Sequence, residues 1–159
     1  MSSTSRSKEI DGQNTDVLLQ YYADRILVVV TQFGKVGSLI QASIPSTAPL
    51  LVPSDAPDAG EDQLPQPPPS IQLTPLMGSA QSDHMHTLNS LYASQIATLV
   101  WLAEEEALRP TRRNVVVGLA LRRTDSETIP ALVDVEKRTF VQIMGVVREA
   151  LASREDSST

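Results

Sequence analysis

The chain has 159 residues, of which 41% are hydrophobic and 20% charged, a balance typical of one globular domain. Its formal net charge of −6 leaves no excess of lysine and arginine for neutralising phosphates, so we expect no nucleic-acid partner. The sequence contains no cysteine, which excludes disulfides, thiolate metal sites and cysteine nucleophiles.

The N-terminal residues, MSSTSRSKEIDGQ, are polar and serine-rich, with no hydrophobic period. Such a segment buries too little apolar surface to offset its ordering entropy, so we expect a disordered extension over residues 1–13. The same reasoning predicts a disordered tail over residues 153–159. No apolar run has the length of a signal peptide or a membrane span, so we expect no membrane partner. A cysteine-free chain of this kind favours the cytoplasm, with the nucleus as a further location.

The domain itself is expected over residues 14–152 and begins with apolar strands. A first strand is predicted over residues 17–22 and a second over residues 25–32, whose apolar run IleLeuValValVal indicates burial on both faces. Gly34 and Gly37 tolerate positive φ, so residues 33–37 predict a tight β-hairpin that leads into a third strand over residues 38–42.

A proline-rich segment follows, since eight of the eleven prolines lie between residues 43 and 70. Proline lacks the backbone N–H that helices and central strands use, so residues 43–70 predict a long surface loop. The run PQPPP also suits a groove that binds polyproline, but we favour a passive loop. Residues 71–77 predict a strand, which Pro75 places at a sheet edge.

The second half of the chain alternates helix, strand and helix. Ser82 or Asp83 can cap a helix that begins near His84, and apolar residues then recur at steps of three and four as far as Leu102. Residues 114–121 predict a buried strand, and an apolar stripe after Pro130 predicts a last helix. With most strands in the first half, this order favours an α+β single domain with an antiparallel β-sheet flanked by two α-helices.

None of the residues with reactive side chains forms a recognisable catalytic motif. The segment around Lys35 resembles the end of a phosphate-binding loop, but Val29 stands where that loop needs glycine, and a strand follows instead of a helix. His84 and His86 form an HxH pair with no further histidine or cysteine, so we expect a solvated pair and no metal site. Without a GxSxG motif, we predict no catalytic residue and no cofactor.

A charged cluster closes the first helix. Glu104, Glu105 and Glu106 lie at its C-terminal end, where the helix dipole disfavours carboxylates, and Arg109, Arg112 and Arg113 follow. We favour a solvated acidic end with arginine neighbours. The alternative is a patch that steers a partner electrostatically, which the salt dependence of binding would reveal.

The run ILVVVTQFGK, residues 26–35, followed by VGSL, resembles the signature hairpin of the proteasome assembly chaperone 3 family. The order of the other predicted elements agrees with this family from about residue 16 to residue 152. The proline-rich loop and the polar extensions are departures from its pattern.

The resemblance implies a small antiparallel sheet flanked by two helices, in a non-catalytic chaperone. It implies a dimer with a proteasome assembly chaperone 4-like subunit, with a homodimer as the alternative for the isolated chain. The dimer would bind 20S proteasome α-subunits and order them into a ring. Expected exposure, independently of the family, marks ten candidate contacts: Gln32, Lys35, Ser38, Glu104, Glu105, Glu106, Arg112, Arg113, Arg122 and Arg123.

Two other classes of protein stay open at this point. A profilin-like or roadblock-like adaptor shares the coarse order of strands and helices, and a pull-down of α-subunits would separate it from the chaperone. A small hydrolase or nucleotide-binding enzyme would use Lys35 or His84, and the incomplete motifs argue against it.

Overall fold

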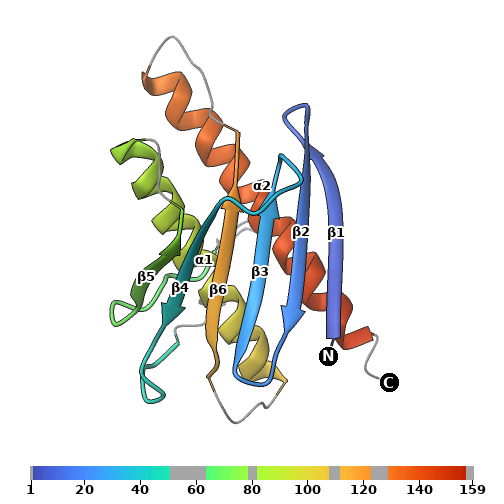
Figure 1. Ribbon diagram of the computed structural model, residues 1–159, viewed down its shortest axis with the longest axis vertical. Coiled ribbons are helices and arrows are strands. Elements are labelled where there is room, and N and C mark those ends of the chain that lie inside the picture. Colours follow the sequence, from blue (N-terminus) through green and yellow to red (C-terminus); the bar gives the residue numbers. More distant parts are fainter. Residues whose placement is uncertain (1, 51–63, 79–81, 108–111, 123–128, 157–159) are drawn as a thin grey trace, which may run out of the picture.

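The computed structural model covers residues 1–159 and describes all of them except residues 1, 51–63, 79–81, 108–111, 123–128 and 157–159. Both helices lie on the same side of one sheet, which gives a two-layer domain (Figure 1). The predicted α+β single domain is thereby confirmed. The elements are β1 (Ser2–Ile10), β2 (Gln13–Tyr21), β3 (Arg25–Thr31), β4 (Ser38–Ser43), β5 (Gln72–Met77), α1 (Asp83–Glu106), β6 (Asn114–Ala120) and α2 (Ile129–Asp156).

The six strands follow the order β1-β2-β3-β6-β4-β5. All neighbours are antiparallel except β3 and β6, which run parallel from the pair Arg25 and Asn114 onward. The tight hairpin predicted at residues 33–37 is therefore wrong, because β6 lies between β3 and β4. The physical reason is burial: β3 and β6 are the most apolar strands, and pairing them places both in the middle of the sheet.

The predicted disordered N-terminal extension is also corrected by the structure. Residues Ser2–Ile10 form β1, which pairs with β2 along its whole length. Asp11 and Gly12, with φ of 50° and 77°, form the turn between them, and an Asp-Gly pair suits a two-residue hairpin loop because both positions need positive φ. Ile10 joins the core. At the other terminus α2 continues to Asp156, so residues 153–156 of the predicted tail are helical.

The helices cover one face of the sheet and enclose an aliphatic core. Helix α1 packs on β4, β5 and β6, and α2 packs on β1 and β2. Ser82 caps α1 as predicted, accepting a hydrogen bond from the backbone N–H of Met85. Trp101 and Tyr92 are the largest fully buried side chains, and the Trp101 indole donates to the backbone oxygen of Arg113 at 2.9 Å. Within the described residues, neither helix combines the length and apolarity of a membrane span.

Part of the proline-rich segment is packed against the domain. Pro65 and Pro68 are buried, Leu64 packs against the core, and the Gln95 side chain donates to the backbone oxygen of Pro65 at 2.8 Å. Residues 51–63 of the predicted loop lie outside the described residues. The start of the polyproline run at Pro65 thus lies against α1, and the passive role that we favour for the loop stays a prediction.

Candidate protein-binding surfaces

The face of the sheet opposite the helices carries an apolar patch. Side chains alternate along a strand, so in β2 Val17 and Leu19 point toward the helices while Leu18 points away from them. No described helix or strand packs on this second face. We call its six aliphatic side chains the open-face patch. Val36 is exposed, Leu18, Leu27 and Leu39 are half-buried, and Val29 and Val116 are buried between them.

Strand register brings these residues together across four strands. Leu18 pairs with Val29, Val29 with Gly118, and Gly118 with Leu39. Gly118 has no side chain, and a Cβ at this position would lie 3.2 to 3.4 Å from side-chain atoms of Leu39, Val36 and Val29. These side chains close over the glycine and make the patch continuous.

Polar residues surround the open-face patch. The neighbouring row of the sheet runs from Gln20 through Leu27 and Val116 to Gln41 and Thr74. Asp16 lies beside it and accepts a hydrogen bond from the Ser7 hydroxyl at 2.5 Å. An apolar centre within a polar rim is the usual anatomy of a protein interface.

The connection between β3 and β4 lies at one end of the sheet and is rigidly folded. The Thr31 hydroxyl accepts hydrogen bonds from the backbone N–H groups of Phe33 at 3.1 Å and Lys35 at 3.2 Å. Gly34 adopts a φ of +71°, which a glycine tolerates without strain. This fold leaves the Phe33 side chain 47% exposed.

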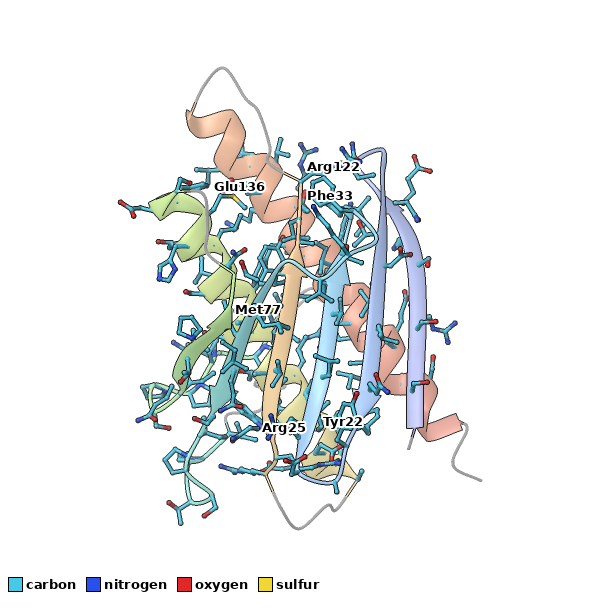
Figure 2. All side chains as sticks on the ribbon, viewed as in Figure 1. Tyr22, Arg25, Phe33, Met77, Arg122 and Glu136 are labelled. Carbon is cyan, nitrogen blue, oxygen red and sulfur yellow. The ribbon has the colours of Figure 1, made fainter. Side chains whose placement is uncertain are left out.

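Two cations flank the Phe33 ring. The Arg122 guanidinium lies 4.8 Å from the ring centroid and the Lys35 ammonium lies 5.5 Å from it, both within cation–π range. Phe33 and Arg122 are seen together at the same end of the domain in Figure 2. We call Phe33, Lys35 and Arg122 the cationic tip.

Gln32 fixes the base of the cationic tip. Its side-chain nitrogen donates to the Thr15 hydroxyl at 3.1 Å, and its side-chain oxygen accepts the backbone N–H of Arg122 at 2.8 Å. This one side chain thus connects β2, β3 and the segment that follows β6. Gln32 was a predicted partner contact, and the structure gives it a positioning role.

A cavity of about 420 Å³ lies behind the cationic tip, between the sheet and the two helices. Its apolar lining includes Ile10, Leu88, Leu121 and Val135, and Phe33 and Arg122 contribute to its wall. Tyr92 also lines it, and burial, with a smaller effect of the Glu136 carboxylate, raises the pKa of this phenol well above its usual value.

The two carboxylates that line the cavity each contact a polar side chain of a helix. Glu136 lies 2.7 Å from the ring nitrogen Nε2 of His84, and Asp11 accepts a hydrogen bond from the Thr139 hydroxyl at 3.0 Å. His84 thus pairs with a carboxylate of α2. Among the described residues, no three His, Cys, Asp or Glu side chains group as metal ligands.

The charged cluster at the end of α1 lies at the opposite end of the sheet, where Figure 2 shows Tyr22 and Arg25. Glu104 is buried and pairs with Arg113 at 2.8 Å, and Arg113 also donates to the backbone oxygen of Tyr22 at 2.6 Å. Glu105 pairs with Arg112 at 2.7 Å. Arg112 further donates to backbone oxygens of the segment after β4. These ion pairs tie the domain together, a tighter arrangement than the solvated acidic end that we favoured.

The ten predicted contacts therefore fall into two separate groups. Gln32, Lys35, Ser38 and Arg122 lie at the end of the sheet with the cationic tip, and Ser38 starts β4 there, half-buried. Glu104, Glu105, Arg112 and Arg113 lie at the other end, and Glu106 is exposed at the end of α1. Arg123 lies outside the described residues.

Sequence reasoning missed Phe33 and the open-face patch. The apolar run of β3 predicted burial on both faces in the middle of the sheet, and this is confirmed except at half-buried Leu27, since even Val29 on the open face is only 7% exposed. The helices cover one face of the sheet, and no described helix or strand packs on the other.

Comparisons with known proteins agree on one family. The family model described as proteasome assembly chaperone 3 matches residues 28–139, which is more than half of the chain. The chain is 49% identical over 47 residues to proteasome assembly chaperone 3 of Nematostella vectensis, covering 30% of this chain and 33% of that relative. The aligned part thus spans one third of the relative's length.

Among solved structures, the chain is similar to one described as a novel chaperone complex for yeast 20S proteasome assembly. The TM-score is 0.47 and the sequence identity 16%, over 92% of this chain and 99% of that one.

Proposed function

Because the chain belongs to the proteasome assembly chaperone 3 family, we propose that it acts as a non-catalytic chaperone in assembly of the 20S proteasome. In this proposal it pairs with a chaperone 4-like subunit, and the pair binds 20S α-subunits and promotes their ordered assembly into a ring. The family match over residues 28–139 carries the proposal.

The open-face patch supports pairing with a second chaperone subunit. Six aliphatic side chains on a rigid sheet, framed by polar ones, suit a second sheet packed face to face, as in a β-sandwich. Burying them would remove apolar surface from water, the main driving force of association. A second copy of the chain is the alternative occupant when the isolated chain is studied.

The engagement of the reactive side chains supports a binding role over catalysis. His84 is paired with Glu136, and Lys35 lies against the Phe33 ring. The family's role as an assembly chaperone points the same way.

Co-expression tests this proposal. The full chain is produced with a chaperone 4-like subunit and with each 20S α-subunit in turn, and native mass spectrometry identifies the purified assemblies. We expect a chaperone heterodimer and a ternary complex with at least one α-subunit. A chain that stays monomeric and binds none of these proteins contradicts the proposal.

A matched pair of variants tests the role of the open-face patch. Leu27→Asp places a carboxylate in the centre of the patch, and it should abolish the heterodimer because the charge would be buried without a partner. Leu91→Asp makes the same change at a leucine of α1 that is 56% exposed on the helix layer, and it should leave the heterodimer intact. Thermal unfolding of both variants shows whether the domain itself remains folded.

A further inference from the structure

We propose that the cationic tip is the docking site for an acidic segment of the client protein, separate from the open-face patch that pairs the chaperone subunits. This inference rests on the proposed function, because the client is taken to be a 20S α-subunit. The segment would carry at least one carboxylate and one apolar side chain.

The charges at the tip are the first argument. Arg25, Arg112 and Arg113 each have a carboxylate partner within 3.0 Å. Among the described residues, Lys35 and Arg122 have no carboxylate within salt-bridge distance, and both cations rest on the Phe33 ring. An arginine placed over an aromatic ring can still offer its N–H groups to a carboxylate, in a bidentate geometry.

The overall charge strengthens this argument. The chain carries a formal net charge of −6, so a positive site on it stands against a negative background. The net charge repels an acidic surface at long range, and the cationic tip offers a local attraction against that background. Such local complementarity orients a partner and raises its association rate, and the effect weakens with salt.

The cavity behind the tip explains the apolar component. Its volume of about 420 Å³ accommodates a large side chain, and Leu88, Leu121 and Val135 supply apolar walls. Phe33 and Arg122 belong both to the tip and to the cavity wall, so a segment can place its apolar side chain inside and its carboxylate on Arg122. Asp11 and Glu136, the acidic lining residues, face Thr139 and His84 and are already engaged.

The rigidity of the tip favours docking without a large ordering cost. Thr31 holds the backbone of Phe33 and Lys35, and Gln32 holds the backbone of Arg122. Little conformational entropy then remains to be lost at the interface when a partner binds. An aromatic ring and an arginine are also the residue types that most often dominate interface energies.

Charge reversal tests this inference on the full chain with its chaperone partner. Affinities of wild type, Lys35→Glu and Arg122→Glu for each purified 20S α-subunit are measured at low and at high salt. We expect each reversal to weaken binding about tenfold at low salt and to flatten the salt dependence, while the chaperone heterodimer persists. Arg25→Glu is the matched control, because it reverses an exposed arginine at the opposite end of β3 and should change affinity less than about twofold.

The outcomes separate this inference from the proposed function. If wild type binds an α-subunit and both tip reversals bind it equally well, the tip inference is overturned while the function stands. If the reversals dissociate the chaperone heterodimer instead, the tip belongs to the dimer interface and the inference is likewise overturned. If wild type binds no α-subunit, both proposals fail together.

Discussion

The buried ion pair between Glu104 and Arg113 offers the sharpest test of how the domain is held together. The two side chains are 8% and 14% exposed, and the nitrogen and oxygen atoms lie 2.8 Å apart. The pair connects the end of α1 to the start of β6. We predict that Arg113→Met strongly destabilises the domain, although methionine retains much of the aliphatic stem.

The magnitude follows from what the substitution leaves behind. Removing the guanidinium breaks the buried ion pair with Glu104, and breaking such a pair by removing one side costs about 3–5 kcal/mol. The Tyr22 carbonyl also loses a donor 2.6 Å away, and the stacking of Arg113 on the Tyr21 ring is lost. For a domain of this size, a loss of 3 kcal/mol lowers the melting temperature by about 10 °C.

Urea unfolding followed by the fluorescence of Trp101 measures this loss, because the indole lies in the core and bonds the backbone of Arg113. Arg25→Met is the matched control: its pair with Asp24 is exposed on both sides, at 51% and 70%, so stability should not change measurably. The double variant Glu104→Gln with Arg113→Met should recover part of the loss, since no full charge is then buried.

Equal stabilities of Arg113→Met and Arg25→Met would refute this reasoning. So would a double variant less stable than Arg113→Met alone, because it would show that the buried charge is not what costs stability.

Three further substitutions probe the sheet, the tip and the cavity. Gly37→Ala should lower the free energy of unfolding by about 2–3 kcal/mol, because the added Cβ would lie 2.3 Å from the backbone oxygen of Leu119. Gly145→Ala is the control: its Cβ meets nothing within 4 Å and should stabilise α2 by up to about 1 kcal/mol. Equal effects would contradict the β4–β6 approach. Thr31→Val should lower the free energy of unfolding by about 1–2 kcal/mol and speed proteolysis after Lys35, because two backbone N–H groups lose their acceptor. An unchanged rate of proteolysis would contradict this role of Thr31. The raised pKa of Tyr92 predicts that this group leaves the stability unchanged below pH 10 and lowers it above pH 10, because the phenol ionises first in the unfolded chain. Tyr92→Phe should therefore reduce the alkaline loss of stability by about 1.4 kcal/mol per pH unit. The same alkaline loss in both proteins would argue against burial of the phenol.

Most individual elements could be predicted from the sequence because their patterns are local. The strand over residues 25–31, the strand over residues 114–120 and the Ser82 cap of α1 follow directly from β-branched runs and capping chemistry. Strand order could not be predicted in this way. The parallel pairing of β3 with β6 joins segments far apart in the chain, and no local pattern distinguishes it from the hairpin that Gly34 suggested.

The first strand was missed for a different reason. Strand β1 is polar and is held mainly by its backbone pairing with β2, so composition alone indicates disorder. The Asp11-Gly12 pair was the available signal, since this dipeptide favours a two-residue hairpin turn. This dipeptide indicates a hairpin only if the following strand is taken to begin at residue 13, before its apolar part.

The candidate surfaces were predictable only in part. Lys35 and Arg122 were identified as exposed cations, but their convergence on Phe33 depends on the fold, because they follow β3 and β6, which are neighbours in the sheet but far apart in the chain. Arg113 and Glu104 were identified as an exposed patch, yet the structure brings them together as a buried ion pair. Tertiary packing decides whether such charged side chains are buried, and their spacing in the sequence does not encode that packing.

The insertion of β6 between β3 and β4 also constrains how the protein is made. A nascent chain that emerges from the ribosome can form the ribbon β1-β2-β3 and the ribbon β4-β5, but they stay separate until residues 114–120 are available. Until then the edges of β3 and β4 that β6 later covers are exposed, and such edges invite wrong pairing between chains. The last strand to be synthesised therefore closes the centre of the sheet. A chain that ends before residue 114 would form two separate, aggregation-prone strand ribbons instead of a smaller domain.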